Sequence, residues 1–289
     1  MKYGFIQEQQ KAYPVTALCS VMQVSRSAYY AWAKRPEATA KDQERQTMER
    51  CATRIFEDSK RTYGSRRLSR ELKKAGFAAG RHQTRSIMAK LGLQPRYPKR
   101  FRVTTNSSHG ESISPNVLDR QFDVAAPNQV WATDITYAWT LEGWLYVAIV
   151  VDLFSRQVVG WAMDGHMRAS LCAQALQMAC WRRKPAAGLL HHSDRGVQYA
   201  SAEYRGHLKA MGMRQSMSRK GNCWDNSPTE RVFRSLKHEQ LNYERFETRD
   251  QAKLSVIDYL AFNNGRRSHS KLGYKTPLEF ERDYYSKTA

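Results

Sequence analysis

The chain has 289 residues, 41% of them hydrophobic, which is enough for more than one domain with a buried core. Its 47 lysines and arginines stand against 27 acidic residues, so the formal net charge is +20. An excess of this size argues against an ordinary metabolic enzyme and favours a polyanionic partner, nucleic acid before membrane. A highly charged surface that only keeps the protein soluble is the plainer alternative.

The sequence contains no pattern that predicts export, a membrane anchor or a cysteine-based metal site. The five cysteines are scattered without a CxxC pair, so we expect reduced thiols rather than a zinc site or disulfides. The N-terminus lacks the apolar stretch of a signal peptide. The longest apolar run, residues 144–151, is far shorter than the ~20 residues that span a bilayer. We therefore expect a soluble, cytoplasmic protein.

The first 93 residues predict an all-α, DNA-binding region. Residues 13–35 indicate two short helices, the second capped by Ser25, and a charged helix follows over 41–58. Two further helices, 63–77 and 81–93, are separated by a short glycine-containing turn, which is typical of a helix-turn-helix. A plain helical bundle with a solvated basic face is the alternative. The basic residues expected to meet DNA are Arg66, Arg67, Arg81 and Arg85.

Residues 94–126 contain several prolines and a basic run, and they predict a linker, which we expect to lie along DNA. Strand patterns then follow at 130–137, 144–152 and 156–163, and later at 188–193 and 213–218. Helices are expected over 169–182, 201–211 and 227–241.

This βββαβαβα order predicts a mixed sheet with helices on its faces, an α/β core over 127–245. Residues 246–289 would form a C-terminal helix and a basic tail, of which 262–280 is expected to be loop-like and separate from the core.

Three acidic residues fall where this architecture brings distant segments together. Asp134 lies in the first strand, Asp194 follows the fourth strand, and Glu230 is in the first turns of the last core helix. Carboxylates are hard ligands suited to Mg²⁺ or Mn²⁺, and two such ions support an in-line phosphoryl displacement. Arg234 and Lys237 follow Glu230 at i+4 and i+7 on the same helical face, as a phosphodiester backbone would require. An ordinary charged helix would show the same spacing.

Other conspicuous side chains have plainer interpretations. Asp152, His191 and His192 are expected to be structural, with the two histidines on opposite faces of their strand. The tryptophans Trp131, Trp144, Trp161 and Trp224 are expected to pack in the core or at interfaces rather than to stack on bases.

Four motifs in this order resemble a known family. They are WATDITY (131–137), HHSDRGVQY (191–199), GNCWDNSPTERVFRSLKHE (221–239) and FNNGRRSHSKLGYKTP (262–277). They are similar to the second-frame (OrfB) product of the insertion-sequence-three family of bacterial transposases, within the retroviral-integrase-like DDE superfamily. Thirty-five residues separate the second and third acids, and the resemblance covers nearly the whole chain.

The resemblance implies a ribonuclease-H-like core in which Asp134, Asp194 and Glu230 are the metal-binding catalytic triad. It further implies that Lys237 contacts the DNA end and that Asp225 and Asn226 support the site. Ser227 stands where the family pattern leads us to expect alanine.

The implied activity is metal-dependent cleavage of insertion-sequence ends, followed by 3′-OH strand transfer, with two divalent ions, Mg²⁺ or Mn²⁺ as a substitute. The implied partners are terminal inverted repeats, target DNA and an upstream-frame OrfA product joined as a fusion, with a homo-oligomer assembled on DNA near the bacterial nucleoid. The chain itself shows no sustained heptads for a zipper. Two alternatives stay open: an RNase-H-like nuclease that hydrolyses DNA without joining it, and a non-catalytic DNA-binding regulator.

Overall fold

The computed structural model describes residues 2–34, 40–96 and 112–288. The chain divides into two compact units, Met1–Cys51 and Ala52–Ala289. None of the helices in the described ranges has the length and apolar character needed to cross a bilayer.

The first unit is a small helical cluster of α1 (Lys2–Gln9), α2 (Val15–Val21) and α3 (Arg26–Ala33). Its core is made of Ile6, Cys19 and Tyr29. The Ser25 hydroxyl accepts a hydrogen bond from the Ala28 amide at 3.1 Å, which confirms the predicted cap of α3. The sequence did not predict α1. The longer α4 (Ala40–Asp58) crosses the boundary between the two units.

In the second unit, the end of α4 is followed by the predicted pair of helices, α5 (Ser65–Lys74) and α6 (Arg81–Lys90). Gly76 and Gly92, just past the two helices, have φ values of +93° and +65°, the left-handed conformation that ends a helix most readily at glycine. The Ser69 hydroxyl donates to the Ala79 carbonyl at 2.7 Å and fixes the turn between the helices. The predicted helix-turn-helix is therefore present.

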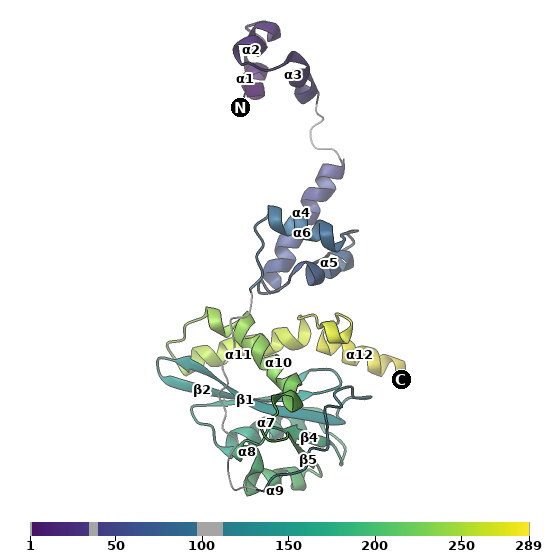
Figure 1. The fold of residues 1–289 in the computed structure, drawn as a ribbon, viewed down its shortest axis with the longest axis vertical. Helices are drawn as coiled ribbons and strands as arrows, with labels where there is room; N and C mark the ends of the chain where they lie inside the picture. Colours follow the sequence, from purple (N-terminus) through teal and green to yellow (C-terminus); the bar gives the residue numbers. More distant parts are fainter. Residues whose placement is uncertain (1, 35–39, 97–111, 289) are drawn as a thin grey trace. The chain divides into compact units, whose positions relative to one another are not determined.

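A five-stranded mixed sheet forms the centre of the second unit, with the order β3-β2-β1-β4-β5 (Figure 1). The three long strands β1, β2 and β3 pair antiparallel, whereas β1, β4 and β5 run parallel. Their bounds are β1 (Val130–Thr140), β2 (Gly143–Asp152), β3 (Val158–Asp164), β4 (Leu190–Ser193) and β5 (Arg214–Met217). The predicted strand order and mixed pairing are confirmed.

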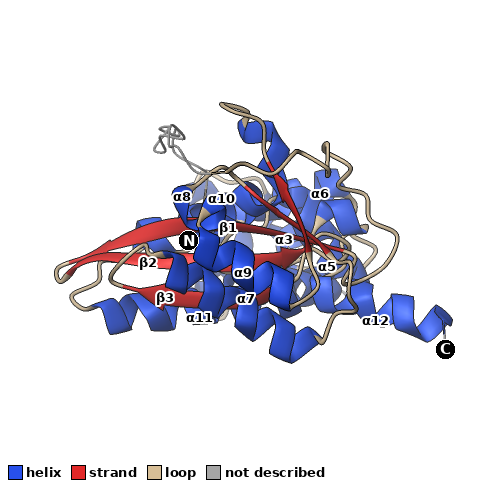
Figure 2. Cartoon of the chain, turned by 90° about the horizontal axis from the view of Figure 1, so that it is seen from below, coloured by secondary structure: helices blue, strands red, loops and turns tan. Residues whose placement is uncertain are grey.

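Helices cover both faces of this sheet (Figures 1 and 2). On one face α7 (Ala169–Arg183), α8 (Val197–Ala200) and α9 (Ala202–Ala210) pack on a core that includes Trp131 and Val150. On the other, α10 (Ser227–Glu239) and α11 (Arg249–Gly265) pack on a core that includes Ile149 and Val151. Two short 3₁₀ turns, η1 (Cys223–Asn226) and η2 (Leu241–Tyr243), flank α10. The interior strand β2, between β3 and β1, is thus buried on both sides, which explains its continuous apolar sequence.

The expectation of a loop-like tail separate from the core is wrong. Residues 262–265 complete α11, and a 3₁₀ turn η3 (Ser270–Leu272) leads into α12 (Pro277–Thr288). The side chain of Asn264 accepts from the Val158 amide at 3.0 Å and donates to the Val158 carbonyl at 2.8 Å. It therefore satisfies backbone groups of the edge strand β3, which a local pattern in the tail does not reveal.

The second half of the predicted linker also packs on the core. Leu118 is buried against Ala132 and Leu153, and its amide donates to the Ser216 hydroxyl at 3.1 Å. Residues 97–111, with the basic run, lie outside the described residues.

Candidate active site

Two of the three predicted acids meet at one edge of the sheet. In the parallel pairing of β1 with β4, Ala132 lies opposite His192. Asp134 follows two residues later within β1, and Asp194 follows two residues later, directly after the end of β4. The two acids are close enough for the Asp194 carboxylate to affect the pKa of Asp134. The Asp134 carboxylate accepts from the Ile135 amide at 2.8 Å, and the Asp194 carboxylate accepts from the Gly196 amide at 2.9 Å. Both side chains are half-buried.

The third acid, Glu230, comes to the same edge on the first turn of α10. The start of that helix is attached to β1, because the Asn226 side-chain amide donates to the Thr133 carbonyl at 3.1 Å. Glu230 itself is exposed. In the described part of the chain no three His, Cys, Asp or Glu side chains are close enough to form a ready metal site. The three acids thus share one region without being gathered into a closed cluster.

The electrostatics show that the acids influence one another. Burial first, and then the Asp194 carboxylate, raise the pKa of Asp134 well above its usual range, and Glu230 adds to the effect. The Ile135 amide and the Lys237 ammonium act in the opposite direction. Burial and Asp194 also raise the pKa of Glu230. The site therefore holds more negative charge than its surroundings compensate, which is the condition that a bound cation relieves.

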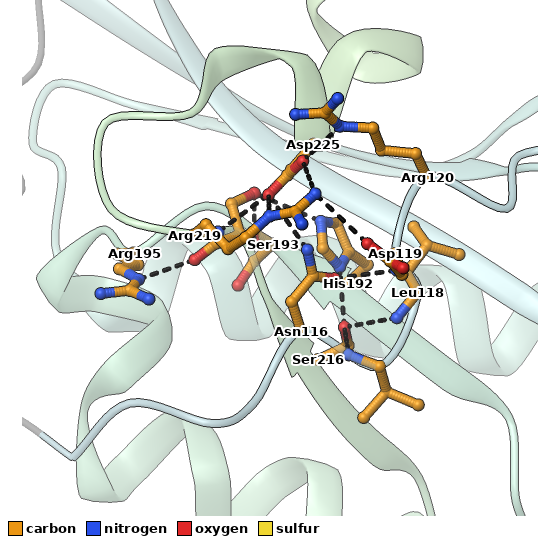
Figure 3. A network of polar contacts seen from close by, with 12 residues as sticks. Asn116, Leu118, Asp119, Arg120, His192, Ser193, Arg195, Ser216, Arg219 and Asp225 are labelled. Atoms are coloured by element: carbon orange, nitrogen blue, oxygen red, sulfur yellow. Dashed lines mark hydrogen bonds and ion pairs between the residues drawn. The ribbon is translucent and has the colours of Figure 1, made fainter.

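The two residues predicted to support the site have distinct contacts. Asp225 is fully buried, and Figure 3 shows it between two guanidinium groups. Arg219 binds it with two nitrogens, at 3.0 and 2.9 Å, and with its backbone amide at 3.0 Å. Arg120 adds a bond of 2.7 Å and Asn116 one of 3.0 Å. These donors, Arg219 above all, hold the pKa of Asp225 well below its usual range despite its burial.

Asp225 therefore fixes the turn that leads into α10, and its neighbour Asn226 attaches that turn to β1. The sequence did not identify Asn116, Arg120 or Arg219. Arg219 lies only six residues before Asp225, which was the one local signal. Asn116 and Arg120 come from the segment that was predicted to be a linker, so no local pattern pointed to them.

Lys237 and Arg234 lie further along α10. The Lys237 ammonium is 4.6 Å from the ring centre of Tyr137. Burial lowers the pKa of Lys237, and the Asp134 carboxylate opposes that shift. Lys237 therefore faces the acids, whereas Arg234 is exposed to solvent.

Three of the four basic residues predicted on the helix-turn-helix, Arg66, Arg81 and Arg85, are exposed. Arg67 is the exception in exposure. It is half-buried, 5.6 Å from the ring centre of Tyr63, and burial followed by the nearby Arg267 lowers its pKa. The guanidinium thus packs partly within the protein, and a contact of Arg67 with DNA stays a prediction.

The structural interpretation of the other conspicuous polar residues is confirmed. The buried Asp152 carboxylate accepts hydrogen bonds from the Asn128 and Phe154 amides at 2.7 and 2.8 Å. It also forms an ion pair with Arg183 at 3.7 Å. His191 bonds to the Tyr204 hydroxyl at 3.0 Å, and His192 lies between the hydroxyls of Ser216 and Ser218. Both histidines are buried because both faces of β4 are covered.

The packing prediction for the tryptophans holds only in part. Trp131 is fully buried, but Trp144 and Trp224 are 42% and 70% exposed. These two lie outside the core, one near a hairpin end and the other on the turn before α10, so for them packing at an interface stays a prediction.

Comparison with known proteins bears on the whole chain. The Integrase core domain family model matches residues 124–223, a second model of the same description matches 211–277, and an HTH-like domain matches 41–101. Transposase InsF for insertion sequence IS3A of Escherichia coli K12 is 40% identical over 283 residues, 97% of this chain and 98% of that protein. The chain belongs to the IS3 family of insertion-sequence transposases. An uncharacterized 31 kDa protein of insertion element IS600 from Shigella sonnei is 41% identical over 94% of this chain and all of that protein.

Solved structures of integrases were also compared. The HTLV-2 integrase catalytic core domain in complex with magnesium has a TM-score of 0.43 and 18% identity, over 54% of this chain and 97% of that chain. A chain of the simian T-cell lymphotropic virus intasome in complex with PP2A regulatory subunit B56 gamma has a TM-score of 0.47 and 17% identity, over 74% and 70%.

The family and its domains confirm several predictions. The sheet order together with the integrase core matches identifies the ribonuclease-H-like α/β fold. Membership of the IS3 family makes the chain a polynucleotidyl transferase of DNA transposition and integration, and the HTH-like domain is a DNA-binding part. An integrase-type core implies the use of a divalent metal ion.

Proposed function

We propose that this chain cleaves the ends of its insertion sequence and joins the freed 3′-OH ends to new DNA, with Asp134, Asp194 and Glu230 as the catalytic residues of a DDE transposase. The observation that supports the proposal is the parallel pairing of β1 with β4, which ends two residues before Asp134 and Asp194, with the start of α10 bound to β1. An ordinary structural ion-pair network would instead place cations between the acids.

The residues present suit divalent ions. The donor set is made of carboxylate oxygens, the ligands that Mg²⁺ and Mn²⁺ prefer. The buried Oδ1 of Asn226, which has no hydrogen-bond partner within the described residues, is a further oxygen at the same place. We propose that the three carboxylates hold two ions, with Glu230 closing the site. Two ions activate the attacking oxygen and stabilise the leaving oxygen of a phosphodiester.

The chain's other groups orient the DNA and the acids. Lys237, which faces Asp134, would hold a phosphate of the DNA end next to the carboxylates. Asp225 and Asn226 act as positioning residues, since they fix the turn before Glu230. Arg234 extends the cationic face of α10 toward the backbone.

The remaining parts follow the same proposal. Arg66, Arg81 and Arg85 would contact the terminal inverted repeats through the helix-turn-helix, and target DNA would approach the sheet edge. We also propose that the chain acts as a fusion with an upstream OrfA product and forms a homo-oligomer on DNA. It would act at the nucleoid in the cytoplasm, and its domain boundaries would lie at residues 93, 126 and 245.

The test is strand joining with the purified full-length chain, supplied with a duplex carrying the element's own end and with Mg²⁺. Asp134→Asn is expected to lower joining by about 10³-fold or more, because several kcal/mol of charge stabilisation is lost. Its affinity for the same duplex in the absence of metal should stay within about threefold of wild type. The matched control is Asp250→Asn, which removes a carboxylate exposed on α11 and should leave joining unchanged.

Joining that survives in Asp134→Asn would refute the assignment of the triad. Products cut by hydrolysis but never joined would favour the nuclease, and metal-independent binding without cutting would favour the regulator. Junctions with abutted ends in cells that carry the element and its upstream frame would extend a positive result to transposition itself.

A further inference from the structure

A cationic cavity lies where the helix-turn-helix meets the C-terminal segment, and none of the three acids is among its lining residues. It has a volume of about 460 Å³. The residues that line it are Arg66, Ser69, Arg70, Lys73, Arg81 and Tyr274. Two segments nearly two hundred residues apart in sequence therefore form one cavity.

The cations around the cavity come from one helical face and the next helix start. Arg66, Arg70 and Lys73 are spaced at i, i+4 and i+7 on α5, so they lie on the same face, and Arg81 is the first residue of α6. Among the residues that the structure describes, no acidic side chain lines the cavity. Glu71, the acid of this helix, pairs with Lys74 instead. Within the described residues, none of these four basic side chains takes part in an ion pair. A bound anion would therefore neutralise positive charge that no acidic side chain compensates.

The aromatic wall of the cavity is held in an unusual backbone conformation. Tyr274 has φ +68° and follows Gly273 at φ +63°. A bulky residue in this left-handed region is strained, and such strain persists only where the surroundings impose it. Here the Tyr274 amide donates to the His269 carbonyl at 2.8 Å, and the His269 amide donates to the Lys275 carbonyl at 3.0 Å. The turn directs the tyrosine ring against the Arg70 guanidinium, 4.8 Å from the ring centre.

We propose that this cavity binds a phosphate group of the DNA backbone, so that the turn around Tyr274 and the helix-turn-helix grip the duplex together. The proposal rests on the proposed function in that the ligand is DNA. Arg66 and Arg81 are shared with the DNA contacts proposed above, whereas Arg70, Lys73 and Tyr274 are assigned here for the first time. The ring keeps the Arg70 guanidinium in place while its remaining N–H groups stay directed at the anion. Arg81 and Lys73 complete the positive wall around the phosphate.

The first test measures the affinity of the full-length chain for a duplex carrying the element's end, in EDTA so that no catalysis contributes. Arg70→Gln and Lys73→Gln are each expected to weaken binding about 5- to 30-fold, as the loss of a charge-assisted phosphate contact does. The slope of log affinity against log salt should also become shallower by about 0.9 for each. The matched controls, Arg214→Gln and Lys209→Gln, remove exposed charges on β5 and α9 and should change neither quantity.

The second test separates binding from stability. Tyr274→Gly relieves the backbone strain but removes the ring, so we expect affinity to fall about fivefold or more while the melting temperature does not fall. Ethylation of single phosphates in the duplex should then reveal one position that weakens wild-type binding but has no further effect on Arg70→Gln.

Pocket variants that bind like the two controls, or an ethylation pattern identical in wild type and Arg70→Gln, would overturn the proposal. Neither outcome touches the catalytic triad, because Asp134→Asn is judged by strand joining. Conversely, the wild-type chain could fail to join DNA while Arg70→Gln still binds DNA more weakly than wild type. That result would support the cavity proposal and refute the proposed chemistry.

Discussion

Replacing Arg267 with leucine removes one half of a buried ion pair at the far end of the helix that carries Glu230. The guanidinium is 7% exposed and binds the Glu239 carboxylate with two nitrogens, at 2.7 and 2.6 Å. It also donates to the Ser235 hydroxyl at 3.1 Å, while the Tyr259 hydroxyl donates to Glu239 at 2.8 Å. The pair therefore joins the C-terminal segment, α10 and α11 at one point.

The expected cost follows from which charge remains. In Arg267→Leu the Glu239 carboxylate stays buried with one hydroxyl donor, and breaking such a pair costs about 3–5 kcal/mol. That is a large part of the 5–15 kcal/mol by which proteins are typically stable. Replacing both partners with leucine should recover about half of the loss or more, because no uncompensated charge is left. The neighbouring Arg266 is exposed, so Arg266→Leu should stay within about 0.5 kcal/mol of wild type.

The assay is equilibrium urea unfolding of the three variants and of wild type, followed by circular dichroism, together with strand joining. Because Glu239 is the last residue of α10, we expect joining by Arg267→Leu to fall as well, with recovery in the double variant. A loss below about 1 kcal/mol for Arg267→Leu, or a double variant less stable than the single one, would refute this reasoning.

Two more predictions concern packing and protonation. A Cβ on Gly160 would lie 2.3 Å from the Ala175 carbonyl oxygen, so Gly160→Ala should lower the free energy of unfolding by about 1–3 kcal/mol, because α7 is forced away from β3. Gly206 lies in open space on α9, so Gly206→Ala should raise the free energy of unfolding by about 0.5–1 kcal/mol. Thermal melting of both variants checks this, and equal melting temperatures would contradict it. Burial lowers the pKa of His191 to about 3, below its unfolded value of about 6.5, so the stability from its neutral form is complete above pH 6.5 and is lost as the pH falls toward 3. Wild type should therefore lose about 2 kcal/mol more than His191→Gln between pH 7 and pH 5 in urea unfolding, and parallel pH profiles would argue against a buried neutral histidine.

The sequence by itself determined the order of elements and the positions of the three acids. Strand and helix periodicity is a local property, so the strands around residues 130–163 and the helices of the helix-turn-helix could be predicted, and Gly76 and Gly92 marked their ends. The acids were found because their neighbours form motifs, as around Asp134 and Glu230, and motifs are also local.

The tertiary structure decided which residues, distant in sequence, form ion pairs or line the same cavity. Asn116 and Arg120 lie in a segment that looks like a linker, and only the sheet topology brings them to Asp225. Arg67 resembles its exposed neighbour Arg66 in sequence, yet it is half-buried and packs against Tyr63. The physical reason is the same in each case. A local pattern indicates the secondary structure of one segment and which of its faces is apolar. Burial and ion pairing depend instead on which residues the rest of the chain packs against that segment.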